Sequence, residues 1–208
     1  MKSKTPLALF FLVYANAQAA TLAGFTFPAS DALEPTTVAG NLTVSDLAIT
    51  SGTISTNITF GSYFPNEPYV QGNSGWTSST QTGAKAFTIT ITADPGFEFS
   101  IDNVFFRGYA TGAGPAAIGF AIGSTNLFAV DAPSSSLVVV DETVSGQTGL
   151  TSAVISIQGW DNDSRTTSGG GDFRIDDVEI SGTVTAVPEP AIALLGGLGL
   201  IGLLRRRR

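Results

Sequence analysis

Apolar and polar residues alternate most strictly near the middle of the chain. In residues 87–92 a phenylalanine and two isoleucines alternate with threonines, which gives the segment one apolar and one polar face. This alternation predicts a half-buried β-strand. The Asp-Pro-Gly triplet at 94–96 predicts a tight turn, and residues 97–101 alternate again. We therefore expect a β-hairpin that joins these two strands.

Short segments of the same kind recur along the chain, with glycine, proline, asparagine or serine between them. They are residues 42–49, 53–60, 104–108, 118–122, 137–140, 154–158 and 173–184. Many short strands separated by turn residues are typical of an antiparallel β-sandwich or β-barrel. The pattern predicts one all-β domain over residues 20–185.

The start of the chain has the three parts of a secretory signal peptide. Lys2 and Lys4 precede an apolar stretch at residues 7–13, and small residues follow as far as Ala20. We expect residues 1–19 to be this signal peptide, the alternative being a buried N-terminal helix. The pattern predicts that the protein is exported.

The end of the chain combines a short apolar segment with a cluster of arginines. Residues 191–204 are apolar, and residues 205–208 are all arginine. Fourteen helical residues reach only ~21 Å at 1.5 Å per residue, whereas a bilayer core is roughly 30 Å thick. The segment therefore predicts a short apolar helix that inserts only transiently into the inner membrane. Basic residues stay in the cytoplasm, which places the body of the chain on the far side.

Charge and composition exclude several classes of function. The chain has a formal net charge of −7, but residues 20–185 contain four basic and sixteen acidic residues, a net charge of −12. A surface this acidic repels phosphates, so we expect no nucleic-acid partner. The sequence has no histidine and no cysteine, which excludes a Ser-His-Asp triad, His-ligated zinc and disulfides.

Asp176 and Asp177 are the candidate metal ligands. An alternating strand directs only one of two adjacent side chains inward, and a buried carboxylate without a partner is costly. A structural Ca²⁺, which prefers several oxygen ligands, would offset that cost. An ion pair with Arg107 or Arg174 would do the same, and a solvated strand edge would avoid it. The sequence leaves these alternatives open.

Trp160, Asp161 and Asn162 are the first candidate for ligand binding. A tryptophan ring stacks on the face of a sugar, and the neighbouring polar side chains bind its hydroxyls. Trp76, in a segment rich in glycine, asparagine and serine, is the second candidate. The alternative for both tryptophans is a place in the core. Carboxylate pairs alone can hydrolyse glycosides, but no pair stands out, so we expect a protein that is not an enzyme.

The C-terminal residues resemble the PEP-CTERM sorting signal of exported bacterial proteins. A Pro-Glu-Pro motif, a glycine-rich apolar segment and terminal arginines follow one another over residues 186–208. The resemblance implies exosortase, a membrane-embedded cysteine transpeptidase, and the secretion machinery as partners. It implies that the sorting residues are Pro188, Glu189, Pro190, Arg205, Arg206, Arg207 and Arg208. The two prolines keep the motif extended and accessible.

Four segments of the body, namely residues 87–101, 112–115, 154–159 and 173–182, resemble the ectodomains of such proteins. Residues 173–182 also resemble the last strand of jelly-roll carbohydrate-binding modules, in which an aspartate helps to hold structural calcium. The resemblance implies an antiparallel β-sandwich of jelly-roll type at the cell surface or outside the cell, associated with exopolysaccharide. Residues 123–128 lack an aspartate found in those ectodomains. The alternatives are an adhesive or structural surface protein with a calcium-stabilised sandwich, and a small glycan-active enzyme.

Overall fold

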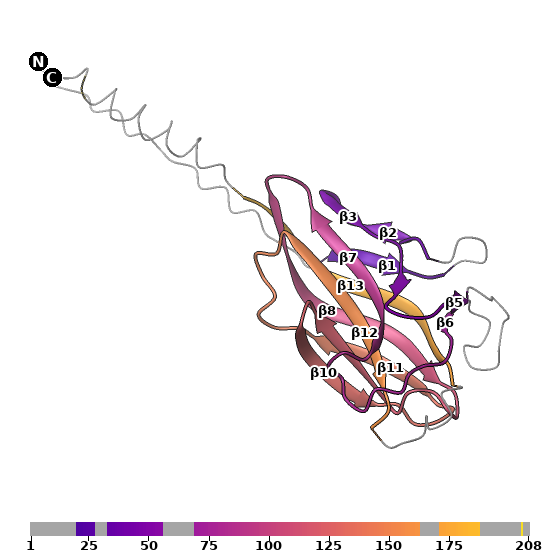
Figure 1. Cartoon of the computed structure of the whole chain (residues 1–208). Helices are drawn as coiled ribbons and strands as arrows, with labels where there is room; N and C mark the ends of the chain where they lie inside the picture. Colours follow the sequence, from indigo (N-terminus) through magenta and orange to yellow (C-terminus); the bar gives the residue numbers. More distant parts are fainter. Residues whose placement is uncertain (1–19, 28–32, 56–68, 163–170, 188–204, 206–208) are drawn as a thin grey trace, which may run out of the picture.

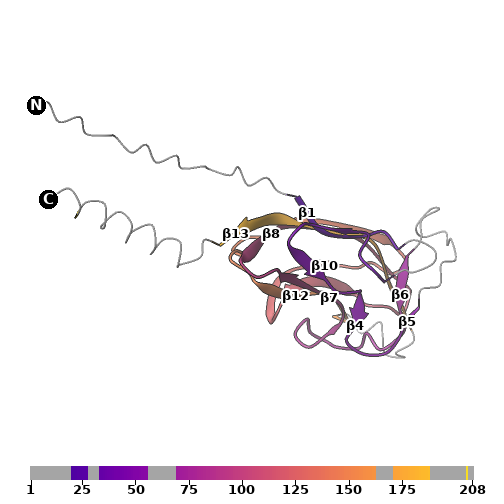
Figure 2. The ribbon, with the colours of Figure 1, turned by 90° about the horizontal axis from the view of Figure 1, so that it is seen from above.

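Two antiparallel β-sheets pack face to face in the computed structural model (Figures 1 and 2). The structure describes residues 20–27, 33–55, 69–162, 171–187 and 205. Within the described ranges all named elements are strands, and the prediction of an antiparallel β-sandwich is confirmed. The predicted signal peptide and the predicted apolar helix both lie outside the described residues. Within those residues the structure contains no apolar helix of the length that a bilayer requires.

The larger sheet has seven strands. Its main path is β11 (Leu137–Thr143), β8 (Phe97–Ala110), β13 (Phe173–Ala186), β1 (Ala20–Phe25) and β2 (Thr37–Val38). Beside this path β6 (Val70–Gly72) pairs with β13, and β5 (Ile54–Ser55) pairs with β6. The longest strands, β8 and β13, pair with each other at the centre.

The smaller sheet has six strands. Its order is β10 (Thr125–Asp131), β9 (Ala117–Ile122), β12 (Ser152–Trp160), β7 (Lys85–Ala93) and β3 (Leu42–Val44), with β4 (Ala48–Ile49) also paired to β7. The alternation predicted for residues 87–92 is present in β7. Phe87, Ile89 and Ile91 are buried between the sheets, while the threonines between them are partly exposed.

The predicted hairpin is wrong, although its turn is present. The amide of Phe97 donates a hydrogen bond to the carbonyl of Asp94 over 3.0 Å, which closes the turn. The chain then crosses to the other sheet, because β7 pairs with β12, β3 and β4 whereas β8 pairs with β13 and β11. Both strands bury one apolar face, and burying these faces against each other across the core satisfies the same alternation as pairing side by side.

The first and last strands are neighbours in the larger sheet. Ala20 of β1 lies opposite Gly182 of β13 in an antiparallel pair. The amide of Val187 extends the ordered backbone by donating to the carbonyl of Gly96 over 2.8 Å. The described sandwich therefore begins and ends at the same end of one sheet.

Candidate functional site

Asp176 and Asp177 lie at an irregularity in the central strand pair. The register of β13 against β8 shifts between Asp176 and Glu179, and Asp177 has a positive φ of 47°. Arg107 on β8 donates to both carboxylates, at 2.7 Å to Asp176 and 2.5 Å to Asp177. Asp176 is 1% exposed and Asp177 is 39% exposed. One aspartate is buried, as the alternation predicts, but the irregularity lets a single guanidinium neutralise both.

This arrangement is the ion pair that the sequence left open as an alternative to calcium. The guanidinium occupies the place where a cation would meet both carboxylates, so these two residues as arranged do not fit a Ca²⁺ site. In the part of the chain that the structure describes, no cluster of three or more acidic side chains could hold a metal. Arg174, the other basic candidate, donates instead to Gln71 over 2.8 Å and stacks on Tyr69 and Tyr109.

Trp76 lies in the core, which is the alternative that the sequence left open beside a sugar-binding ring. It is 1% exposed and packs edge-on against Phe173, with ring centroids 5.2 Å apart. Its indole Nε1 donates to the carbonyl of Gly72 over 3.1 Å. The ring in this position offers no face to a sugar, because its neighbours in the core cover it.

Trp160 ends β12 and is also covered. It is 7% exposed and packs with Ala84 and Ala117 in a small apolar cluster. Asp161 is nearly buried, and its amide donates to the carbonyl of Ser78, whereas Asn162 is exposed. The three residues are adjacent, but the tryptophan ring does not form an open platform beside the polar groups.

Lys85 is a buried cation that the sequence analysis did not single out. Its ammonium donates to the carbonyls of Asn73 and Ser74, both over 2.7 Å, and lies 4.8 Å from the centroid of the Trp76 ring. Burial lowers the pKa of Lys85 from its ordinary value of 10.5, and the negative charge of Asp172 opposes this shift to a smaller extent. The lysine holds the 73–74 backbone against the start of β7.

The lowered pKa of Lys85 predicts a pH-dependent stability. Between the lowered value and 10.5, the unfolded chain keeps a proton that the folded protein has released, so stability rises with pH in that window. We expect the free energy of unfolding of the wild type, relative to that of Lys85→Met, to increase as the pH approaches 10.5 from below. Urea denaturation at a series of pH values measures this, and a difference that stays flat or falls would contradict it.

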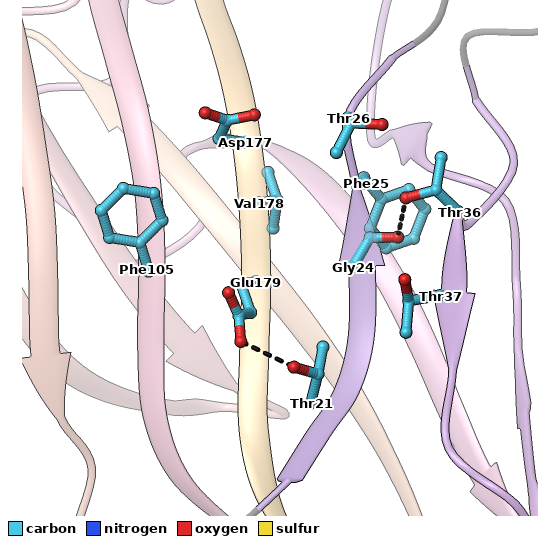
Figure 3. A pocket seen from close by; sticks show the side chains of 10 residues that line it. All are labelled: Thr21, Gly24, Phe25, Thr26, Thr36, Thr37, Phe105, Asp177, Val178 and Glu179. Atoms are coloured by element: carbon cyan, nitrogen blue, oxygen red, sulfur yellow. Dashed lines mark hydrogen bonds between the residues drawn. The ribbon is translucent and has the colours of Figure 1, made fainter.

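An open groove lies on the outer face of the seven-stranded sheet, over β8, β13, β1 and β2 (Figure 3). We call it the outer groove. Its volume is about 260 Å³. Four threonines line it, namely Thr21, Thr26, Thr36 and Thr37, together with the carboxylates of Asp177 and Glu179 and the ring of Phe105. The groove thus combines an apolar wall with hydroxyl and carboxylate groups.

The carboxylate of Glu179 is held in place by hydroxyls. Thr21 donates to Glu179 Oε1 over 2.7 Å, and Ser181 donates to the same oxygen over 3.1 Å. Apart from Asp177, none of the groove residues was a sequence candidate. The pairing of Thr21 with Glu179 joins residues 158 positions apart, and no local pattern encodes it. The available signal was Gly24 within an otherwise apolar segment, since a glycine inside a strand often marks a place where a ligand or another backbone segment approaches the strand closely.

The predicted sorting residues lie almost entirely outside the described part of the chain. Pro188, Glu189, Pro190, Arg206, Arg207 and Arg208 are not described, whereas Arg205 is described and exposed. Their role therefore depends on comparison with other sequences.

The sandwich is similar in structure to carbohydrate-binding modules. One match is the carbohydrate-binding module CBM36 in complex with calcium and xylotriose, at 17% identity over 64% of this chain and 92% of that chain, with a TM-score of 0.41. Another is the CBM36-1 domain of a multidomain xylanase from the hindgut metagenome of Trinervitermes trinervoides, at 15% identity over 67% of this chain and 96% of that chain, with a TM-score of 0.41. A third is the CBM22-1–CBM22-2 tandem domain of Paenibacillus barcinonensis Xyn10C, at 14% identity over 86% of this chain and 49% of that chain, with a TM-score of 0.44.

Comparison with known sequences identifies the end of the chain. No curated protein matches the chain as a whole. A family model described as the PEP-CTERM protein-sorting motif matches residues 186–208, the range that the sequence analysis assigned to the sorting signal. The last strand of the sandwich ends at Ala186. The chain therefore carries a PEP-CTERM protein-sorting motif directly after its β-sandwich.

Proposed function

We propose that this protein is an exported, non-catalytic surface protein that exosortase sorts and that associates with polysaccharide outside the cell. The observation that carries the proposal is the PEP-CTERM motif at residues 186–208. The motif starts at the residue where β13 ends, so the processing site and the folded domain are separated by at most a few residues. Processing would release or transfer the sandwich with its last strand intact.

The position of β1 supports a tethered intermediate. Because Ala20 lies opposite Gly182, the first and last strands meet the rest of the chain at the same end of the sandwich. A membrane-inserted tail would therefore place this end nearest the membrane. The loops at the other end of β13 would point away from the membrane, and the outer faces of the two sheets would remain accessible from outside.

The charged groups of the sandwich support a binding role over catalysis. Without histidine, glycan hydrolysis would require one carboxyl group held as a proton donor and a second as base or nucleophile. Asp176 and Asp177 are instead paired with Arg107, and Glu179 accepts hydrogen bonds from Thr21 and Ser181. These contacts bury the charge of Asp176 in an ion pair and hold the carboxylates of Asp177 and Glu179 as hydrogen-bond acceptors on a rigid surface.

Replacing the Pro-Glu-Pro motif tests the sorting step. In a variant with Pro188, Glu189 and Pro190 all changed to alanine, we expect full-length protein to accumulate in the membrane fraction of the producing cells. The wild type should lose its tail and leave that fraction. Immunoblotting of cell fractions and mass spectrometry of the C-terminus measure both.

A variant with alanines at Thr183 and Thr185 is the matched control, since it changes β13 just before the motif and should be processed normally. Equal processing of the Pro-Glu-Pro variant and the wild type would contradict the proposal.

A further inference from the structure

We propose that the outer groove is a glycan-binding site that accepts chains of neutral or amino sugars and excludes acidic ones. This inference rests on the proposed association with polysaccharide and assigns it to a place on the fold. The groove lies on the outer face of the seven-stranded sheet, away from both tryptophans that the sequence analysis named as candidates.

The groove exists because a glycine replaces a side chain in the outward-facing row of the sheet. At this level the paired residues are Phe105 on β8, Glu179 on β13, Gly24 on β1 and Thr37 on β2. Phe105 and Glu179 rise on one side and Thr37 on the other, with the missing side chain of Gly24 between them (Figure 3). The backbone of β1 thus forms the floor of the depression.

The lining suits the two kinds of surface that a sugar presents. Phe105 is only partly buried, and its ring gives an apolar wall for the C–H groups of a pyranose. Asp177 and Glu179 supply carboxylate oxygens, each of which accepts hydrogen bonds on more than one lone pair, so sugar hydroxyls can bind beside the existing partners. Sites of this kind combine apolar walls with a few placed polar groups.

The polar groups are fixed before any ligand arrives. Thr21 orients Glu179, Arg107 orients Asp177, and Thr36 donates through Oγ1 to the carbonyl of Gly24 over 3.0 Å. Because these side chains are already ordered, less conformational entropy is lost when a ligand binds. Thr21 and Thr37 stand on β1 and β2, whereas Thr26 directly follows β1 and Thr36 directly precedes β2.

The charge of the groove selects the class of glycan. Two carboxylates line it, and residues 20–185 have a net charge of −12. Uronate, sulfate or phosphate groups would be repelled both at the groove and during approach. Neutral hydroxyls and ammonium groups meet no such repulsion, either at the groove or during approach.

The volume of the groove, about 260 Å³, lies just below the range of about 300–1,000 Å³ typical of small-molecule sites. This size fits a short segment of a longer glycan chain.

Two variants test the groove: one fills it without changing its charge, and the other removes a charge without changing its shape. Gly24→Val adds a side chain to the floor, and its Cβ would make ordinary van der Waals contacts, 3.4 Å to Thr37 and 3.7 Å to Thr21. Gly40→Val is the matched control, because a Cβ there meets nothing within 4 Å and lies outside the groove.

Glu179→Gln keeps the shape of the groove but removes one charge. Glu142→Gln, an exposed position on β11, is its control.

Segment 20–187 is suitable for the measurement because every described strand lies within it. Isothermal titration calorimetry would use dextran, chitosan oligomers, polygalacturonate and the exopolysaccharide of the producing cells as probes. Circular dichroism would verify the fold of each variant. We expect the wild type to bind dextran or the chitosan oligomers and not polygalacturonate. Gly24→Val and Glu179→Gln should each weaken binding about tenfold or more, and both controls should bind as the wild type does.

Each other outcome overturns a defined part of the inference. Unchanged binding by folded Gly24→Val and by Glu179→Gln would overturn the groove as the site while leaving polysaccharide association intact. Binding of polygalacturonate would overturn the proposed glycan class. Failure of the wild type to bind any probe, or the exopolysaccharide of the producing cells, would overturn the polysaccharide association itself and the groove with it.

Discussion

Replacing Arg107 with methionine is expected to destabilise the sandwich by about 3–5 kcal/mol, because removing one partner of a buried ion pair leaves the other charge uncompensated. The remaining charge is that of Asp176, which is 1% exposed and accepts from Arg107 over 2.7 Å. Methionine keeps an apolar, unbranched stem in place of the arginine stem and removes the guanidinium, so the loss reports chiefly on the removed charge and its hydrogen bonds. Urea denaturation at neutral pH, followed by circular dichroism, measures the change.

The matched comparison is the double variant Arg107→Met with Asp176→Asn. It removes both charges, so it should be more stable than Arg107→Met alone even though it carries an additional substitution. Asp176→Asn alone should cost less than Arg107→Met, since Arg107 is 17% exposed and keeps Asp177 as a partner. If Arg107→Met lost less than about 1 kcal/mol, the pair would behave as an ordinary surface salt bridge, and our account of the β13 irregularity would be wrong.

Trp76→Ala is expected to cost about 3–5 kcal/mol, the range for truncating a large buried aromatic side chain. The ring packs against Phe87 and Phe173, with centroid distances of 5.7 and 5.2 Å. Its loss would open a cavity between the sheets, remove the donor to the Gly72 carbonyl, and uncover the ammonium of Lys85. The midpoint of urea denaturation should fall markedly.

Trp76→Phe separates packing from ligand contact. It keeps an aromatic ring in the core and removes the indole N–H, so its loss of stability should be clearly smaller than that of Trp76→Ala. Glycan affinity of the folded Trp76→Phe variant should equal that of the wild type. A variant that kept full stability but lost glycan binding would place Trp76 at a binding surface and contradict its position in the core.

The strands were predictable because alternation is a local property of the chain. Residues 87–92 and 173–184 lie within β7 and β13. Strand partners are not local. The turn at 94–96 has the sequence of a hairpin turn, yet it connects two different sheets, because the same apolar face can be buried across the core as well as beside a neighbour.

The candidate site was predicted less well, for a related physical reason. A tryptophan beside polar residues has the composition of a sugar-binding site, but composition does not tell whether the ring is exposed, and both Trp76 and Trp160 are buried. The ion pair of Arg107 with Asp176 was among the alternatives, since a buried carboxylate requires a partner. The outer groove depends on the register that places Gly24 beside Glu179. This register arises only when β1 pairs with β13, two strands far apart in the sequence.

The central place of β13 has a consequence for the order in which the protein folds during export. β13 lies between β8 and β1 in the sheet and also pairs with β6, which carries β5, so the larger sheet remains three separate pieces until the last strand joins them. Contacts between segments so distant in sequence form slowly, because loop closure must precede them. The larger sheet thus cannot close before β13 is available, whereas the smaller sheet does not include β13. On the export route proposed above, β13 would be the last strand to cross the membrane, directly ahead of the sorting motif, so completion of the larger sheet would be coupled to arrival at the processing enzyme.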